Sequence, residues 1–232
     1  MDPPRRAAGR ETLPAVRRPG RLRRAAAAGA VALVAVAAGC AGGGGDEGDG
    51  GAAGDEPALA GAVRTPPLEV SDVVLPDAVT GEPVAMQAPP GELYVVYFGY
   101  TSCPDVCPTT MNDVAVALGD LPDDLADRVT VAMATVDPER DTAEVLTGYL
   151  DHFFTRHLAL RTTDPAALTA ATEAFGVQWE VEEHEPGEAY EVAHTAVTYV
   201  VDDTGTVVVE WPFGLDSESM AADLRTLLEE RA

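Results

Sequence analysis

Residues 93–108 read LYVVYFGYTSCPDVCP, and this stretch decides the fold. Its first part, 93–99, is a continuous run of apolar, β-branched and aromatic side chains, which is typical of a buried central strand. Beyond the stretch, apolar residues recur at helical spacing from Met111 to Leu118. The sequence therefore predicts a strand that leads directly into a helix, with two cysteines in the turn between them.

The segments on either side predict an alternation of strands and helices. The other expected strands are an opening hairpin from residue 70, then 129–135, 158–160 and 177–181, and a hairpin of 195–201 and 206–211. The other expected helices begin at Asp141-Thr142, with Val145 on the apolar face, at Asp164-Pro165 and at Ser217. This order of elements predicts a thioredoxin-like α/β fold, which is a three-layer sandwich with a central mixed sheet.

The first 40 residues differ from the rest of the chain in charge. They hold eight of the 15 basic residues and two of the 39 acidic ones, and the arginines precede a short apolar run, 25–38. This is the layout of a secretory signal peptide, since a membrane-spanning helix needs roughly 20 apolar residues. Cys40 follows small residues and resembles a lipobox cysteine, although Ala37 stands where that pattern prefers leucine. We expect residues 1–40 to be a signal peptide ending at a lipidated Cys40; an uncleaved anchor with an incidental cysteine is the alternative.

The remaining chain divides into a tether and a domain. Residues 41–61 are rich in glycine, alanine and acids without apolar periodicity, so we expect a disordered tether. Residues 62–232 form the expected domain, held on the extracytoplasmic face of the cell membrane. After Cys40 the chain has 37 acidic residues, seven arginines and no lysine. Such a charge excludes nucleic acid as a partner and favours cations or basic protein surfaces.

Cys103 and Cys107 lie where the predicted strand turns into the predicted helix. The pair can be a structural disulfide, a redox pair or a metal site. The helix start favours thiolates, so we expect both thiols to ionise more readily than free cysteine. The spacing is C-x-x-x-C, whereas redox-active thioredoxins use C-x-x-C. Two thiolates are soft ligands that suit copper(I) and leave room for a third donor.

Four histidines are available as that third donor. His152 and His157 flank an aromatic helix end, where surface or capping roles are expected. His184 lies in an acidic loop, where it is expected to be solvated. His194 stands at the start of a predicted strand, after an irregular loop. In a thioredoxin-like fold that strand begins beside the cysteine turn, so His194 is the best candidate for a ligand.

The chain resembles the Sco/SenC family of copper chaperones over roughly residues 70–228. The strings that carry the resemblance are FGYTSCPDVCP (98–108), TVDPERDT (135–142), HTA (194–196) and YVVD (199–202). In that family two cysteines and a histidine bind copper on a thioredoxin-like fold. The resemblance implies that Cys103, Cys107 and His194 bind one copper ion, as Cu(I) or Cu(II), and that the two cysteines can form a redox disulfide.

The resemblance also implies a partner and leaves two roles open. Members of the family help to load the binuclear copper centre of cytochrome c oxidase subunit II. They act either as copper donors or as thiol–disulfide oxidoreductases that reduce the copper-site cysteines of that subunit. We expect a chaperone without catalytic turnover, since disulfide exchange has no need for His194. A peroxidase of the peroxiredoxin type would need a threonine three residues before its cysteine, where this chain has Tyr100 and Pro104.

One departure from the family pattern concerns the residue before the histidine. That residue is often aspartate in the family, and here it is Ala193. A carboxylate there would orient the imidazole and raise its basicity. In its absence we expect Glu191 or a backbone carbonyl to take over the orienting role. The string 137–142 is open between a structural loop cap and a partner-docking surface.

The lipobox interpretation predicts a single lipid attachment point. Wild-type protein should partition with membranes and incorporate radioactive palmitate, and Cys40→Ser should abolish the label. Cys103→Ser, which alters a cysteine of the expected domain, serves as the control and should remain labelled. A Cys40→Ser protein that still carries the label would place the anchor on another residue.

Overall fold

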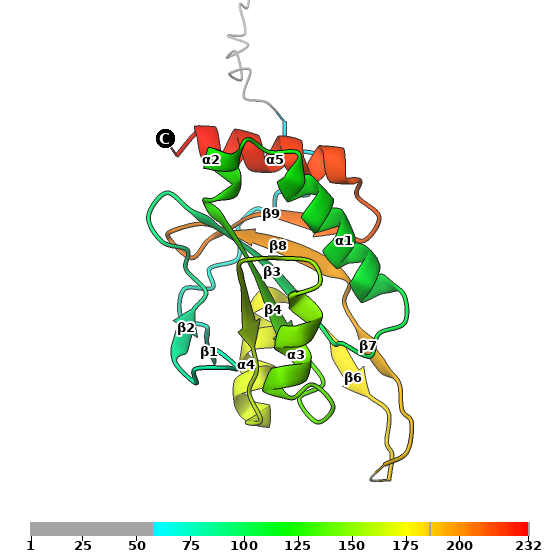
Figure 1. The fold of residues 1–232 in the computed structure, drawn as a ribbon. Helices are drawn as coiled ribbons and strands as arrows, with labels where there is room; N and C mark the ends of the chain where they lie inside the picture. The colour runs from blue at the N-terminus through cyan, green and yellow to red at the C-terminus, as the bar shows by residue number, and fades with distance from the viewer. Residues whose placement is uncertain (1–57, 186, 232) are drawn as a thin grey trace, which may run out of the picture. The chain divides into compact units, whose positions relative to one another are not determined.

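The computed structural model describes residues 58–185 and 187–231, and its centre is a five-stranded mixed sheet (Figure 1). Its strands are β3 (Leu93–Gly99), β4 (Val129–Thr135), β5 (His157–Leu160), β8 (Val197–Val201) and β9 (Val207–Pro212). They lie in the order β5-β4-β3-β8-β9. Strands β3, β4 and β5 are parallel, and β8 and β9 join them in antiparallel pairing. The mixed sheet of the predicted thioredoxin-like fold is therefore confirmed.

Helices cover both faces of this sheet. They are α1 (Val106–Gly119), α2 (Asp123–Ala126), α3 (Ala143–Leu150), α4 (Pro165–Phe175) and α5 (Ser217–Glu229). Helices α1 and α5 pack together on one face, and α4 packs on the other (Figure 1). Because successive side chains of a strand point to opposite faces, Phe98 of β3 meets Phe175 of α4, with ring centroids 5.1 Å apart, whereas Tyr97 contacts Cys107 of α1.

Two small antiparallel sheets stand beside the main one. The first is the hairpin of β1 (Val74–Pro76) and β2 (Pro83–Ala85). The second pairs β6 (Trp179–Val181) with β7 (Val192–His194). We call residues 179–185 and 187–194 the histidine arm; it extends away from the five-stranded sheet (Figure 1). His194 lies at the base of the arm, three residues before β8 begins.

Most of the element predictions are confirmed, and four need correction. Strands β3 and β4 have the predicted ends, and Gly176 ends α4 in the left-handed conformation, with φ of 69°. The strand expected from 177 lies in the arm, outside the main sheet, and the opening strand begins only at Val74. Asp216 rather than Ser217 caps α5, because its carboxylate accepts the Ser219 N–H. Val145 is exposed, because α3 turns it away from the core.

The predicted signal peptide, its Cys40 and most of the tether lie outside the described residues. At the end of the expected tether, the Ala60 and Gly61 N–H groups donate to the buried Asp223 carboxylate of α5, at 2.7 and 3.0 Å. The domain boundaries otherwise stay predictions. Within the described part of the chain, no helix has both the length and the apolar character that crossing a bilayer requires.

Packing at the end of β3 predicts a requirement for glycine. A Cβ on Gly99 would lie 2.5 Å from a ring carbon of Tyr97 and 3.2 Å from the Cys107 sulfur, and both neighbours are fully buried. Gly99→Ala should therefore lower the free energy of unfolding by about 1–3 kcal/mol through overpacking, as measured by urea denaturation. Gly119→Ala is the matched control, since a Cβ there meets nothing within 4 Å and alanine favours a helix. Equal unfolding midpoints for the two variants would contradict this account.

Candidate metal centre

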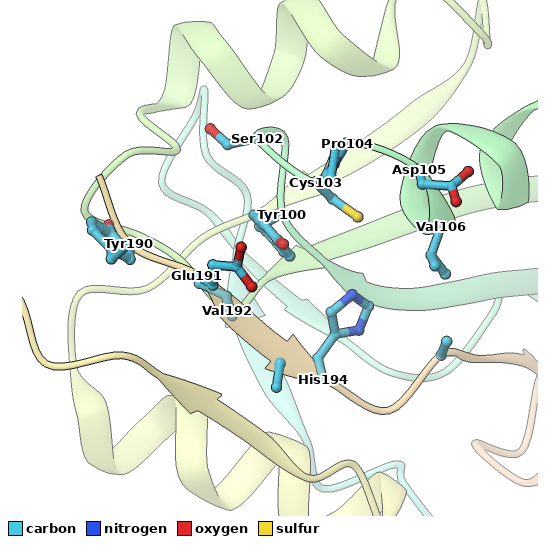
Figure 2. A pocket seen from close by; sticks show the side chains of 12 residues that line it. Tyr100, Ser102, Cys103, Pro104, Asp105, Val106, Tyr190, Glu191, Val192 and His194 are labelled. Atoms are coloured by element: carbon cyan, nitrogen blue, oxygen red, sulfur yellow. The ribbon is translucent and has the colours of Figure 1, made fainter. Parts of the chain in front are cut away.

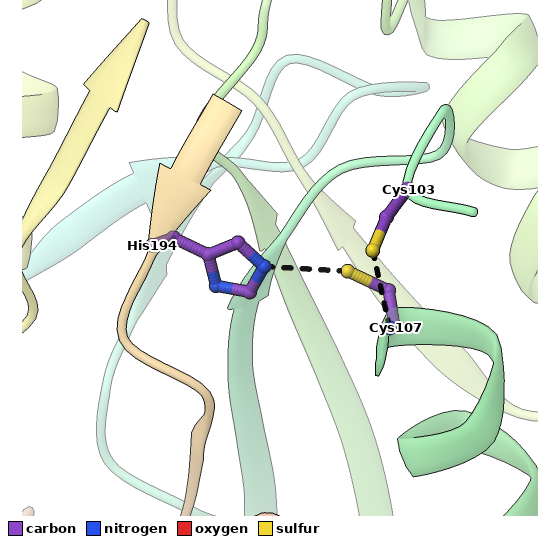
Figure 3. A group of neighbouring side chains, drawn as sticks. All are labelled: Cys103, Cys107 and His194. Carbon is purple, nitrogen blue, oxygen red and sulfur yellow. Dashed lines mark hydrogen bonds between the residues drawn. The ribbon is translucent and has the colours of Figure 1, made fainter. Parts of the chain in front are cut away.

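Three side chains with metal-ligating atoms converge at one edge of the sheet. Cys103 lies in the turn after β3, Cys107 is in the first turn of α1, and His194 is the last residue of β7. The His194 Nε2 lies 3.4 Å from the Cys107 Sγ, and the Cys107 N–H donates to the Cys103 Sγ at 3.4 Å (Figure 3). The three ligand atoms all lie within 4.8 Å of one another. Among the histidine, cysteine, aspartate and glutamate side chains of the described residues, these three form a group close enough to hold one metal ion.

The cysteine turn and the start of α1 each accommodate a proline. Pro104 lies in the turn before the helix, and Pro108 is the third residue of α1, where an N–H has no intrahelical partner. The turn leaves β3 at the carboxyl end of the strand, where α/β proteins commonly expose their functional groups. Both thiols are free, Cys103 partly exposed and Cys107 fully buried.

The His194 ring is held in one orientation by its neighbours. Its Nδ1 lies 3.1 Å from the Thr195 carbonyl oxygen, which can only accept a hydrogen bond. The proton therefore belongs on Nδ1, and Nε2 keeps its lone pair directed at Cys107. Tyr97 and Tyr100 meet the imidazole edge-on, with centroids 5.8 and 5.7 Å away. Burial lowers the pKa of His194, which favours the neutral ring that a metal requires.

The orienting group that replaces the missing aspartate is thus the backbone carbonyl of Thr195. The hydrogen bonds of the His194 ring go to Thr195 and Cys107 rather than to Glu191, which lines the pocket beside it (Figure 2). A further difference from the sequence prediction is that His194 ends β7, and β8 starts only at Val197. The residue before the histidine, Ala193, is exposed on the arm.

The two thiols have opposite tendencies to ionise. For Cys103, burial alone would raise the pKa, but hydrogen bonds from the Cys107 and Asp105 N–H groups outweigh it, and the pKa lies below the ordinary value. Burial raises the pKa of Cys107 to about 12. The prediction that both thiols ionise readily is therefore wrong for Cys107. The reason is that its side chain points into the core beneath Tyr97, although its backbone lies at a helix start.

A pocket of about 490 Å³ gives access to the site (Figure 2). Its walls are the cysteine turn, 102–106, together with Tyr100 on one side and residues 190–194 of the histidine arm on the other. Cys103 and His194 line it. A group from a second molecule could therefore approach the ligand atoms from this side without any opening of the core.

The other three histidines do not reach the cysteines. His152 Nδ1 lies 2.5 Å from the Gly148 carbonyl oxygen at the end of α3, and His157 Nε2 contacts Asp151 at 3.0 Å. The capping role is confirmed for His152. It is wrong for His157, which begins strand β5 with only 10% of its side chain exposed. His184 differs from the expectation of a solvated side chain, because it stacks on Tyr190 with centroids 3.6 Å apart.

The string 137–142, which the sequence left unassigned, lies next to the site and is structural in part. The Thr142 hydroxyl accepts the Val145 N–H and caps α3. Asp137 and Asp141 are buried, with 2% and 0% of their surface exposed. No periodicity in the sequence distinguishes a buried aspartate from an exposed one. The sequence therefore held no signal for their contacts, or for the tyrosines around His194.

Comparison with known proteins relates the chain to one family. The SCO1/SenC family model matches residues 76–229. A SCO2-like protein of Rickettsia prowazekii is 35% identical over 116 residues, which cover 50% of this chain and 56% of the relative. The matches to three Rickettsia relatives span between 56% and 66% of the length of those proteins.

Two solved structures extend the comparison over the whole fold. The solution structure of apo Sco1 from Thermus thermophilus is 33% identical, with a TM-score of 0.65, and covers 75% of this chain and 99% of its own. The structure of Bradyrhizobium japonicum ScoI with copper bound is 32% identical, with a TM-score of 0.57, and covers 72% of this chain and 98% of its own.

The unequal thiols lead to a prediction about alkylation. Iodoacetamide attacks thiolates, so it should modify Cys103 much faster than Cys107, because Cys103 lines the pocket and has the lower pKa. Peptide mapping by mass spectrometry after short exposure of the reduced protein at pH 7–8 measures both rates. In urea the two rates should become similar, which serves as the control. Faster modification of Cys107 in the folded protein would contradict the assignment.

Proposed function

Because the chain belongs to the SCO1/SenC family, we propose that it binds one copper ion through Cys103, Cys107 and His194 and passes it to another protein. The observation that carries this proposal is the convergence of two thiol sulfurs and an imidazole nitrogen within 4.8 Å of one another. Cys107 and His194 are 87 residues apart in the chain, so only the fold brings the cysteine pair and the histidine together. The relative from Bradyrhizobium japonicum, whose structure has copper bound, supports copper as the metal.

The donor set fits copper(I) by its chemistry. Two thiolates and one imidazole are soft or borderline ligands, which favour copper(I) over calcium or magnesium. The neutral, Nδ1-protonated His194 offers a lone pair at Nε2 without losing a proton. The thiols must release their protons when the metal binds, so copper binding should strengthen as pH rises. Copper(II) is the second state in which the site would hold the ion.

Delivery rather than storage is supported by the access to the site. Three protein donors leave room for a ligand from a second molecule, and the pocket beside Cys103 and His194 gives such a ligand a way in. An incoming thiol or imidazole could join the ion before the carrier's own ligands leave, so free copper need never form. We propose that the recipient is cytochrome c oxidase subunit II, whose binuclear copper centre the ion would enter.

The location of the protein belongs to the same proposal. A signal peptide over residues 1–40 and a lipid on Cys40 would hold the domain at the extracytoplasmic face of the membrane. The recipient named above is a membrane protein, so an anchor would confine donor and recipient to one surface. The acidic domain would be repelled by anionic lipid and so remain off the bilayer at the end of its tether.

The alternative function is a thiol–disulfide oxidoreductase that acts on the copper-site cysteines of the recipient. It is favoured by one observation: Cys103 is partly exposed, lines the pocket and has a lowered pKa, as an attacking thiol needs. In this reaction the client disulfide would gain two electrons and two protons. Cys103 and Cys107 would supply them and become a disulfide. His194 has no part in that exchange.

The demand on His194 separates the two functions. In the carrier, His194→Ala removes a ligand, so it should weaken copper(I) binding by more than the 10–100-fold typical of changes outside the ligand set. Competition with a chromogenic copper(I) chelator measures this on the purified full-length protein, and disulfide exchange with a model disulfide should persist. His152→Ala, which alters an exposed histidine, is the matched control and should bind like wild type.

A cellular test completes the comparison. In cells that lack the protein, His194→Ala should fail to restore cytochrome c oxidase at low copper, as should Cys103→Ser. Full rescue by His194→Ala, together with no rescue by Cys103→Ser, would overturn copper delivery in favour of the reductase. Both variants must be present at wild-type abundance for the comparison to count.

A further inference from the structure

The histidine arm joins the main sheet only at its base, where β7 leads into β8. Strand β7 pairs only with β6, in a sheet separate from the five-stranded one. Near its base the arm is closed by Thr195, whose N–H donates to the Gln178 carbonyl at 2.9 Å. These contacts tie one strand of the arm to the other. At the base, the Phe213 N–H donates to the Ala196 carbonyl at 3.1 Å, which joins the arm to the main sheet beside His194. The part of the arm before His194 has no strand partner in the main sheet, so its position depends on contacts with other parts of the molecule.

The loop between β4 and α3, residues 136–142, contacts the cysteine turn through Asp141. This carboxylate is fully buried and accepts the N–H of Thr101 at 3.1 Å and the Thr101 hydroxyl at 2.6 Å. It also accepts the hydroxyl of Thr135, at the end of β4, at 2.6 Å. Thr101 stands two residues before Cys103. Asp141 therefore fastens the turn that carries the first thiol to the end of a core strand.

The same loop contacts the histidine arm through Asp137. This second buried carboxylate accepts the Tyr190 hydroxyl at 2.7 Å and pairs with the Nε of Arg140. The Arg140 Nη1 donates to the Tyr190 carbonyl oxygen at 2.9 Å. Tyr190 is thus held at its hydroxyl and at its backbone, four residues before His194.

The Tyr190 ring is held on both faces as well. The Arg140 guanidinium carbon lies 3.7 Å from the ring centroid, and the His184 imidazole stacks on the ring at 3.6 Å. Two planar groups this close to one ring must lie on opposite faces of it. Arg140 also lies 5.6 Å from the centroid of Tyr100, whose ring meets the edge of His194. The guanidinium therefore stands between the arm and the residues around the ligands.

From these contacts we propose that the β4–α3 loop sets the geometry of the copper site by holding its two halves with two separate carboxylates. Asp141 positions the cysteine turn, and Asp137, with Arg140 and Tyr190, positions the arm that carries His194. None of these residues belongs to the group of Cys103, Cys107 and His194; they are positioning residues. The inference deepens the proposed function and rests on it, because the geometry matters only if the site holds a metal.

The test compares two conservative substitutions that affect the histidine arm with a control substitution of an arginine far from the site. Arg140→Lys keeps the positive charge but loses the planar guanidinium, which donates to both Asp137 and the Tyr190 carbonyl. Tyr190→Phe keeps the ring and loses its hydroxyl. Each should weaken copper(I) binding by the roughly 10–100-fold typical of residues that orient ligands. Each should also reduce the nitrogen coupling in the electron paramagnetic resonance spectrum of the copper(II) form. Arg64→Lys alters a comparable pair, with Glu210 on the surface, and should change neither.

The sulfur side has its own variant and its own readout. Asp141→Asn should alter the alkylation rate of Cys103 while the nitrogen coupling remains. Wild-type copper affinity and full nitrogen coupling in both Arg140→Lys and Tyr190→Phe would overturn the proposal. Circular dichroism checks folding; if Arg140→Lys does not fold, Tyr190→Phe decides the question alone.

A metal-free measurement keeps this inference separate from the proposed function. If wild-type protein binds no copper, the proposed function fails, but the positioning of the arm can still be measured by hydrogen exchange. The amides of residues 192–195 should exchange faster in Arg140→Lys and Tyr190→Phe than in wild type, because the arm loses its anchor. Unchanged exchange in both variants would overturn the proposal, whatever the result with copper.

Discussion

Strand β3 lies between β4 and β8 and is buried on both of its faces, and the rest of the structure is arranged around this burial. A strand with large apolar side chains on both faces needs a packed layer on each side. Phe98 packs against α4 on one face, and Tyr97 packs against the cysteine turn and His194 on the other. At position 99 the neighbouring side chains of Tyr97 and Cys107 leave no room for a Cβ. Glycine there lets the chain turn closely into α1, with Cys107 packed against it.

This arrangement gives the two thiols different environments from one short turn. Cys107 is enclosed by the core, whereas Cys103 reaches the pocket and receives backbone hydrogen bonds. A metal carrier benefits from both conditions. An enclosed sulfur protects the ion from water and oxidants, and an exposed sulfur allows exchange with a second protein. The same inequality would serve a thiol reductant, in which the exposed sulfur attacks and the buried one resolves the mixed disulfide.

Buried carboxylates give this acidic protein a second kind of organisation. Among the described residues most acids are at least partly exposed, but Asp137 and Asp141 are buried and engaged with hydroxyl, amide and guanidinium donors. A buried carboxylate without such partners would cost several kcal/mol, by the order of magnitude of ion desolvation. The donors therefore have to be in place when the protein folds. That requirement couples the loop after β4 to the cysteine turn on one side and to the histidine arm on the other.

The sequence by itself determined the central strands, the order of the elements and the positions of the cysteine pair, because apolar runs, caps and turns are local signals. It also singled out His194, although only through its place in a motif. Tertiary structure alone decided that the Cys107 thiol faces the core, that a carbonyl rather than Glu191 orients the imidazole, and that Tyr190 anchors the arm. These features depend on which groups meet across long separations in the chain. Residue type and spacing do not indicate such long-range contacts, since an aspartate or a tyrosine is the same letter in the sequence whether its side chain is solvated or buried.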